Sequence, residues 1–438
     1  MSTAERSMGL GLRALNRLAG SDLLDRAGLR KRVERSVFQG TRRGFRTAGA
    51  ASRSFNAVAR LAGPARQAAA RAPGLFDLTP DDEQQMLREA IDAFAAERIR
   101  PAALLADGAC ATPPEILDLA AELGVGILGV PEELGGVMAE RSAVTSVLVT
   151  EALARGDLGI ALAALAPSAV ATALGLWGNG EQQSTYLPAF ASENAPAAAL
   201  ALLEPRPLFD PMRLETRARA DAGGWILNGA KALVPRAAEA ELFVVAAEAE
   251  GRGPALFIVE SSTSGVFTEP EPAMGLRAAA TGRLILEDVR LPSTALLGEG
   301  HREVFLECVQ RARVAWCALS VGAAQAVLDY VTPYVNERVA FGEPISNRQA
   351  VAFAVADIGI ELEGMRLLTY RAASRADAGK SFDREAALAR RLCAEQGSRI
   401  GSEGVQLLGG HGFVKEHPVE RWYRDLRAAG VMEGALLV

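Results

Sequence analysis

The chain has 438 residues, of which 49% are apolar and 23% charged, so two to four domains are expected instead of a single core. Its three histidines and four scattered cysteines form no metal-binding spacing, which argues against a zinc hydrolase and predicts buried thiols in a reducing compartment. The longest apolar stretch, 158–178, is rich in alanine and contains Pro167, so we expect a buried helical hairpin there instead of a membrane span.

Charge is distributed unevenly along the chain. Residues 1–75 hold fourteen Arg and one Lys against two Asp and two Glu, a net charge of +11, whereas the remainder carries −17. We interpret residues 1–75 as a basic helical extension. Such a segment can bind an anionic membrane face or nucleic acid, pack on the acidic body, or act as a mitochondrial transit peptide. Of these we expect peripheral membrane contact and no nucleic-acid partner.

Helical signals dominate from residue 78 to about residue 190. Thr79 and Pro80 predict the start of a helix over 78–101, which has acidic residues in its first turn. The segment "GVGILG" (124–129) matches the dinucleotide-binding pattern GxGxxG, but the residues before it have helical character instead of the strand that the pattern requires. We therefore reject a dinucleotide site there, and the sequence contains no Walker loop for ATP.

Short β-rich runs bounded by Gly and Pro begin near residue 198. The segment "WILNGAKALV" (225–234) predicts two strands around a turn at Asn228-Gly229. From about Val304 helical patterns return, and apolar residues spaced by three and four over 351–365 predict a long bundle helix that Gly379 ends.

Two glycine-containing segments could bind a ligand. In "ERVAFGEPISNRQAV" (337–351), Arg338 could hold a phosphate next to a Gly-Pro turn, although a polar connection between helices explains the same residues. In "GGHGF" (409–413), the glycines leave backbone N–H groups open to a ligand, although a glycine-terminated helix and loop is the simpler interpretation.

The chain ends with "VMEGALLV", in which Glu433 is a lone carboxylate among apolar residues. A buried carboxylate is costly unless it is paired, neutralised or used in a reaction. The alternative is that Glu433 is solvated in a frayed tail.

Taken in order, several stretches resemble the acyl-CoA dehydrogenase family of flavoproteins. The resemblance runs from about Phe76 to Gly434, and one such stretch alone would be weak, whereas the ordered set is specific. The stretches are "LGVGILGVPEELGG", the "EP" before the β region, "WILNGAK", "LILEDVRLP", "RVAFGEPISNRQA", "GVQLLGGHGF", "HPVERWYRD" and "MEGA".

The resemblance implies a multidomain α+β fold. We expect the basic extension (1–75), a helical N-terminal domain (76–197), a middle β-barrel (198–302) and a C-terminal four-helix bundle (303–438). Family members are usually homotetramers with FAD between subunits, so we expect a homotetramer or dimer. They oxidise the Cα–Cβ bond of an acyl-CoA thioester, as in fatty-acid β-oxidation, and pass the electrons to an electron-transfer flavoprotein.

The resemblance also implies roles for individual residues. Glu433 falls on the position of the base that removes the α-proton, and Arg313 is expected at the substrate. Some members place the base on an earlier helix, directly before an Arg, but here that residue is Ala312. The residues expected to bind FAD are Arg338, Phe341, Gln349, Leu203 and the backbone of Gln406, Leu407, Leu408, Gly409 and Gly410, the last five from a neighbouring subunit. No metal is expected.

Four positions depart from the family pattern on the flavin side. Leu203 and Phe209 replace a Thr and a Ser, and Leu233 and Pro235 replace a Trp and a Thr. Two functions therefore remain open: an FAD-dependent acyl-CoA dehydrogenase, and a catalytically impaired scaffold subunit that pairs with a complete paralogue. We expect a cytoplasmic and peripherally membrane-bound protein, with the mitochondrial matrix as the alternative.

Overall fold

The structure is a computed structural model that describes residues 80–136, 141–192 and 194–433. The predictions made for residues 1–75, and for the residues that follow Glu433, lie outside these ranges.

Helices form the first part of the described chain. The helix α4 begins after Asp81, whose side chain caps the backbone N–H of Gln84 while the Gln84 side chain accepts from the Asp81 N–H. The predicted start at Thr79 and Pro80 was therefore slightly early, because this reciprocal capping box fixes the helix end. The helices are α4 (Asp82–Phe94), α5 (Arg100–Ala109), α6 (Pro114–Glu122), α7 (Ala143–Gly156), α8 (Leu158–Trp177) and α9 (Gly180–Phe190), with a π-helical turn (Ala95–Ile99) between α4 and α5.

The apolar stretch 158–178 forms the single helix α8, so the predicted hairpin was wrong. Pro167 lies inside this helix, where it removes one backbone hydrogen bond, but burial of almost every face of the helix offsets that loss. Both α8 and α10 (Arg302–Glu337) are long and apolar enough to span a membrane. However, 78% and 72% of their most apolar windows are buried within the structure, which is the behaviour of core helices.

The middle of the chain folds as an eight-stranded sheet. Its order is β6-β7-β3-β2-β4-β5-β8, and β1 pairs in parallel with β4. The strands are β1 (Ala198–Ala201), β2 (Arg217–Asp221), β3 (Gly224–Val234), β4 (Leu242–Ala249), β5 (Gly253–Glu260), β6 (Val266–Pro270), β7 (Gly282–Pro292) and β8 (Leu296–Leu297).

The predicted turn at Asn228-Gly229 is instead a bulge within the continuous strand β3. The register between β3 and β7 shifts between Leu227 and Gly229. Gly229 has φ +149°, and a Cβ there would lie 2.6 Å from the Cα of Thr216. The Asn-Gly pair therefore serves a close approach between strands and does not reverse the chain.

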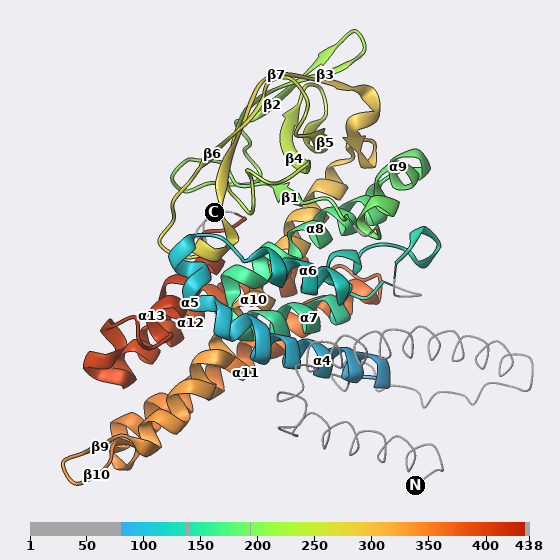
Figure 1. Ribbon diagram of the computed structural model, residues 1–438. Helices are drawn as coiled ribbons and strands as arrows, with labels where there is room; N and C mark the ends of the chain where they lie inside the picture. The colour runs from blue at the N-terminus through green and yellow to red at the C-terminus, as the bar shows by residue number, and fades with distance from the viewer. Residues whose placement is uncertain (1–79, 137–140, 193, 434–438) are drawn as a thin grey trace, which may run out of the picture. The chain divides into compact units, whose positions relative to one another are not determined.

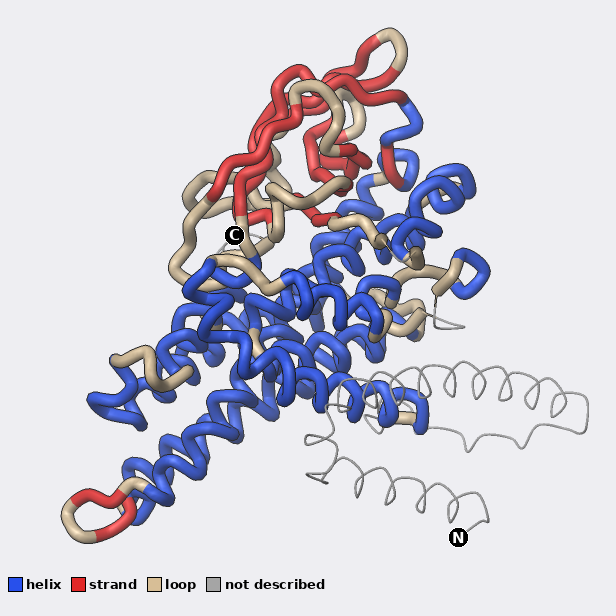
Figure 2. The backbone as a smooth tube through the Cα atoms, viewed as in Figure 1, coloured by secondary structure: helices blue, strands red, loops and turns tan. Residues whose placement is uncertain are grey.

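Helices return after the sheet and pack with α7 and α8 around the central helix α10 (Figures 1 and 2). The remaining elements are the hairpin strands β9 (Val339–Ala340) and β10 (Glu343–Pro344) and the helices α11 (Gln349–Asp377), α12 (Asp383–Leu408) and α13 (Val419–Asp425). As predicted, Gly379 terminates α11, with φ +63°. A helical N-terminal domain, a β-sheet domain and a C-terminal helical domain confirm the predicted fold class.

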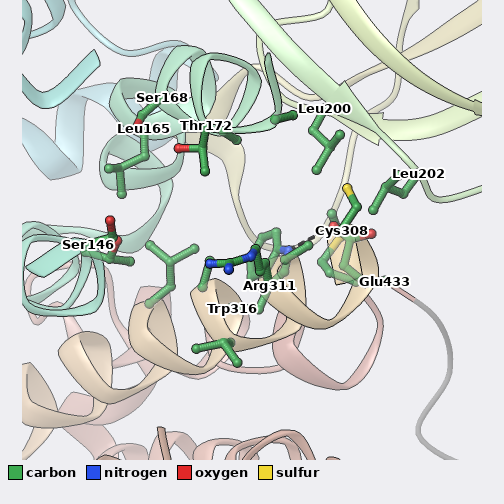
Figure 3. Close-up of a pocket in the computed structure, with 18 of the residues that line it drawn as sticks. Ser146, Leu165, Ser168, Thr172, Leu200, Leu202, Cys308, Arg311, Trp316 and Glu433 are labelled. Carbon is green, nitrogen blue, oxygen red and sulfur yellow. Dashed lines mark hydrogen bonds between the residues drawn. The ribbon is translucent and has the colours of Figure 1, made fainter. Parts of the chain in front are cut away.

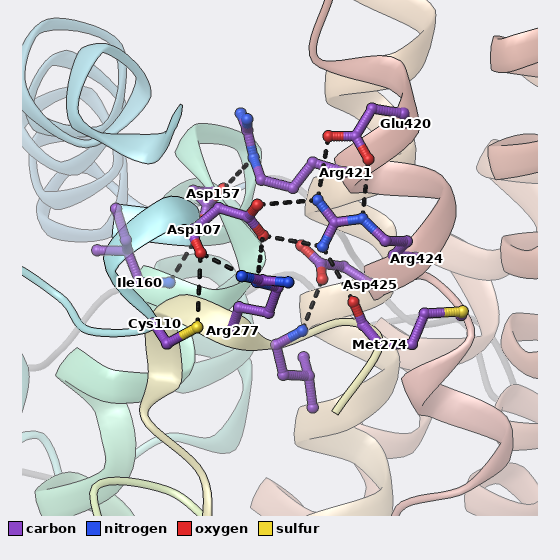
Figure 4. Close-up of polar contacts among 11 residues, drawn as sticks. Asp107, Cys110, Asp157, Ile160, Met274, Arg277, Glu420, Arg421, Arg424 and Asp425 are labelled. Atoms are coloured by element: carbon purple, nitrogen blue, oxygen red, sulfur yellow. Dashed lines mark hydrogen bonds and ion pairs between the residues drawn. The ribbon is translucent and has the colours of Figure 1, made fainter. Parts of the chain in front are cut away.

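Buried ion pairs connect the three domains near α13 (Figure 4). The guanidinium of Arg424 donates to both carboxylate oxygens of Asp107 on α5, at 2.8 and 3.0 Å. Arg421 donates to Asp157, which caps α8, at 2.8 Å. The backbone N–H of Leu276, in the sheet domain, donates to Asp425 at 2.7 Å.

Burial shifts the pKa values of the carboxyl groups in this cluster. Burial, reinforced by the charge of Asp157, raises the pKa of Asp425 to about 7. Because this folded-state pKa lies above the unfolded value of about 4, the stability that Asp425 contributes is complete below pH 4 and is lost as pH rises through about 7. Burial also raises the pKa of Asp157, and the Arg421 charge opposes that shift.

We predict that Arg421→Ala destabilises the protein by ~3–5 kcal/mol, because it leaves Asp157 buried and without its charge partner. Thermal or urea unfolding of the variant measures this loss. The matched control is Arg290→Ala, which breaks an exposed pair with Asp221 at 2.8 Å and should cost less than about 1 kcal/mol. Equal losses in the two variants would contradict the importance of the buried pair.

Candidate active site

Glu433 lies in a well-anchored turn at the end of the described chain. The Nε and Nη2 atoms of Arg313 on α10 donate to the Glu433 carbonyl at 3.2 and 3.0 Å. Arg390 on α12 donates to the Met432 carbonyl at 2.6 Å. Glu433 is only 7% exposed and has φ +57°. A solvated, frayed Glu433 is therefore excluded, and the two arginines fix the backbone that carries it.

The two carboxylate oxygens of Glu433 have different environments. Oε1 accepts a hydrogen bond of 3.2 Å from the indole N–H of Trp316, whereas Oε2 is buried and has no hydrogen-bond partner among the described residues. Burial raises the pKa of Glu433, and the Trp316 hydrogen bond and the charges of Arg390, Arg313 and Lys231 oppose that shift. One oxygen is thus held in place, and the other is available to accept a proton.

Glu433 faces a cavity of about 220 Å³ (Figure 3). Its walls come from α7, α8, α10 and α11 on one side and from β1, β3 and the segments that follow these strands on the other. Most of the lining is apolar, and its polar side chains include Ser146, Thr172 and Arg311. Such a cavity, with few polar groups, is typical of a small-molecule site.

A buried ion pair supports the sheet side of this cavity. Lys231 is fully buried, and its Nζ donates to Glu204 at 2.9 Å and to the Leu202 carbonyl at 3.3 Å. Glu204 also accepts from the backbone N–H groups of Glu215 and Thr216. Burial lowers the pKa of Lys231 to about 8, and the charges of Glu204 and Glu433 oppose that shift. The pair fixes Leu202 and places a positive charge near Glu433.

The sheet side of the cavity offers few hydrogen-bond donors. Leu203, Leu233 and Pro235 line it. The backbone N–H of Leu233 is already used, because it donates to Glu271 at 2.7 Å, and proline has no N–H. Phe209 does not line the cavity; it is buried under the guanidinium of Arg206, 5.4 Å from the ring centre.

The other predicted cofactor residues lie at the opposite end of α10. Arg338 follows the last residue of this helix, and the exposed Phe341 and Gln349 come just after it. The hydroxyl of Tyr334 donates to the Leu408 carbonyl at 3.4 Å, which brings the Gln406–Gly410 segment to the same end. From Trp316 to Arg338, α10 rises about 33 Å at 1.5 Å per residue. One chain therefore does not bring the two groups of residues together.

Sequence analysis missed Trp316, Arg390 and Lys231 as site residues. Trp316 follows Ala312 by four positions, so helical spacing places it on the face where an alternative base was sought. Lys231 and Glu204 lie within the quoted "WILNGAK" and "EP" motifs. No comparable sequence signal marks Arg390, whose role depends on how α12 packs beside the final turn.

Comparison with known proteins gives consistent relatives. Three family models match: the acyl-CoA dehydrogenase N-terminal domain over residues 81–194, the middle domain over 199–289 and the C-terminal domain over 299–436. The chain is 34% identical over 362 residues to the mitochondrial short-chain specific acyl-CoA dehydrogenase of Bos taurus, covering 81% of this chain and 87% of that protein.

Two solved structures extend the comparison to the fold. Butyryl-CoA dehydrogenase from Megasphaera elsdenii aligns with a TM-score of 0.77 at 28% identity, over 83% of this chain and 97% of that chain. A chain in a structure of the electron transferring flavoprotein of Acidaminococcus fermentans gives the same TM-score and the same coverages at 29% identity. The matched models, sequence relatives and structures agree in all three domains, and the chain belongs to the acyl-CoA dehydrogenase family.

Proposed function

We propose that the protein is an FAD-dependent dehydrogenase that introduces an α,β double bond into an acyl-CoA thioester, with Glu433 as the base. The observation that carries this proposal is the buried Glu433 carboxylate, which has one oxygen held by Trp316 and the other without a partner beside an apolar cavity. Family membership supports the same chemistry.

The α-proton of a thioester is only weakly acidic, so its base must be more basic than a solvated carboxylate. Burial of Glu433 raises its pKa and so supplies this basicity, while the Trp316 hydrogen bond and the charges of Arg390 and Arg313 oppose the shift. Trp316 fixes the side chain so that Oε2 takes the α-proton. FAD, when bound, would accept the β-hydride. The apolar walls exclude water from the reacting carbons.

The residues present fit FAD only if two chains share it. Within one chain, the cavity beside Glu433 and the exposed Arg338 and Gln349 lie about 33 Å apart along α10. We therefore propose a homo-oligomer in which Arg338, Phe341, Gln349 and the Gln406–Gly410 backbone of one chain bind the pyrophosphate and adenosine of the FAD whose flavin occupies its partner's cavity. The chain resembles a component of an electron transferring flavoprotein structure, which supports such a flavoprotein as electron acceptor.

The buried Glu433 favours an enzyme over a scaffold subunit. An ionised carboxylate in an apolar cavity is costly, and a chain without a reaction gains nothing from keeping it there. Leu203, Leu233 and Pro235 replace residues that would contact the flavin. In this proposal, these replacements weaken cofactor binding but leave the base in place.

We predict that Glu433→Gln lowers the rate at which acyl-CoA bleaches the bound flavin by about 10²–10⁴-fold. Glutamine keeps the size of the side chain and an oxygen for the Trp316 hydrogen bond, so the fold and bound flavin should persist. Stopped-flow absorbance under anaerobic conditions measures the rate. The control is Glu395→Gln, an exposed carboxylate paired with Arg391. Bleaching at the wild-type rate in the Glu433 variant would refute its role as base.

We predict that Trp316→Phe moves the acid limb of the pH–rate profile to higher pH. The indole hydrogen bond lowers the pKa of Glu433, so its loss raises that pKa further and protonates the base at higher pH. A bond worth about 0.5–1.5 kcal/mol corresponds to roughly 0.4–1 pH unit. Trp177→Phe, which removes an indole that donates to Glu307 instead, is the control and should not shift the limb. An unshifted limb in Trp316→Phe would exclude this tuning.

We predict that the protein purifies with partial FAD occupancy. Leu203, Leu233 and Pro235 supply no side-chain donor, and the Leu233 N–H is engaged by Glu271. Leu203→Thr should restore one hydrogen bond and lower the Kd for FAD by roughly 2- to 10-fold in a fluorescence titration. The control is Leu208→Thr, an exposed position outside the cavity. Nanomolar FAD affinity in the unmodified protein would refute weak binding, and absence of binding at millimolar FAD would favour a scaffold subunit.

A further inference from the structure

Two of the three histidines of the chain meet beside the last turns of α10. The imidazole rings of His411 and His417 lie nearly parallel, at 15° to one another, with their centres 5.3 Å apart. His411 belongs to the turn Gly409–Phe413 that follows α12, and His417 lies just before α13. Neither side chain belongs to the site around Glu433, so the pair requires a separate explanation.

Two tyrosines of α10 hold the rings in this arrangement. Tyr330 and Tyr334 are four residues apart, and a helix places such residues one above the other, about 6 Å apart along its axis. The Tyr330 hydroxyl lies 2.7 Å from Nδ1 of His417. The Tyr334 hydroxyl lies 2.9 Å from Nδ1 of His411. Behind them, the fully buried Trp422 packs edge-on against Tyr330, with ring centres 5.7 Å apart, so the histidine pair rests on the core.

The other ring nitrogen of each histidine is open to a ligand. Among the residues that the structure describes, Nε2 of neither ring has a hydrogen-bond partner. The Tyr334 hydroxyl donates its proton to the Leu408 carbonyl, so it accepts from His411, and Nδ1 of His411 carries a proton. When Nε2 is protonated as well, His411 is an imidazolium that can donate to an anion, and such charge-assisted hydrogen bonds are the strong ones.

The pair lies next to residues already proposed to bind the pyrophosphate and adenosine of FAD. His411 directly follows the Gln406–Gly410 segment. The backbone N–H of Arg338 donates to the Tyr334 carbonyl at 2.9 Å, while the hydroxyl of the same tyrosine contacts His411. One end of α10 therefore collects a guanidinium and two imidazoles, a set of donors that fits an anion with several oxygens.

We infer that His411 and His417 form a further phosphate subsite, which binds the pyrophosphate of FAD through Nε2 and acts together with Arg338. This inference rests on the proposed function, in which the flavin of the same FAD occupies the cavity of a partner chain. A pyrophosphate supplies the acceptor oxygens that the two Nε2 atoms lack. Its negative charge also offsets the repulsion between positively charged rings 5.3 Å apart.

The contrast between ADP and adenosine tests the subsite without using activity. Both compete with FAD for the adenosine site of the FAD-saturated, full-length protein, but only ADP carries a pyrophosphate. We expect His411→Phe, which keeps a ring for the stack but has no nitrogen, to raise the Ki for ADP by at least about tenfold in a fluorescence competition titration. The Ki for adenosine should not change.

Variants at matched positions separate a ligand contact from a structural one. His411→Arg keeps a cationic donor and should bind ADP within about threefold of the unmodified protein. His301→Phe, directly before the opposite end of α10, where His301 lies 3.6 Å from Glu299, should leave both constants unchanged. Tyr334→Phe removes the hydroxyl that holds His411 and should raise the Ki for ADP alone, by about 2- to 10-fold.

Two outcomes would overturn the inference: an unchanged Ki for ADP in folded His411→Phe, and an equal rise of the constants for ADP and adenosine. Circular dichroism and size-exclusion chromatography check folding and assembly of each variant. If His411→Phe does not fold, His417→Phe with the same pair of competitors takes its place.

Calorimetry with the protein as purified distinguishes the inference from the proposed function. ADP binding that requires His411, in a protein that takes up no FAD, would support the subsite and overturn the proposed function. Acyl-CoA oxidation by an FAD-loaded protein whose affinity for ADP does not depend on His411 would support the proposed function and overturn the subsite. If neither FAD nor ADP binds, both fail.

Discussion

The site depends on keeping one carboxylate buried without neutralising it completely. Arg313 and Arg390 could have formed direct ion pairs with Glu433, which would have stabilised its charged form and made it a poor base. Instead their guanidinium groups bind the carbonyls of Glu433 and Met432. The positive charges stay near enough to oppose the effect of burial on the pKa of Glu433. Among the described residues, its carboxylate accepts one hydrogen bond, from Trp316. The arginines thus fix the backbone position and limit the pKa shift together.

This arrangement lowers the stability of the fold at a pH where Glu433 is ionised. Because the folded-state pKa of Glu433 is raised, the stability that it contributes is complete below its unfolded pKa and is lost as pH rises through the folded value. Buried pairs elsewhere compensate by joining the domains. Asp107 with Arg424 and Asp157 with Arg421 connect α5 and α8 to α13, a few residues before the final turn. The position of Glu433 therefore depends on contacts that also define how the domains pack.

Sequence patterns predicted the fold class and singled out Glu433, but not the contacts that surround its carboxylate. The final motif singled out Glu433 because a lone carboxylate stands there among apolar residues. Trp316, Arg390 and Lys231 act through packing between distant elements, which no local pattern encodes. The errors have the same origin. Pro167 is accommodated because α8 is buried on most faces, and Asn228-Gly229 forms a bulge because Thr216 packs against Gly229. In both places tertiary contacts overrode a local signal.

The geometry of α10 links the chemistry to assembly. Toward its start, Arg311 lines the cavity and pairs with Glu307. At its middle, Trp316 donates to Glu433. After its end, Arg338 lies beside the Gln406–Gly410 segment. A rigid helix keeps these distances fixed. A cofactor site that includes both the cavity and Arg338 must therefore be completed by a second chain. Because Leu203, Leu233 and Pro235 supply no side-chain hydrogen bonds at the cavity wall, a larger share of cofactor binding falls on the contacts that the partner chain makes. In the proposed enzyme, assembly and cofactor affinity are consequently coupled: a change that weakens the contact between chains should also release the flavin.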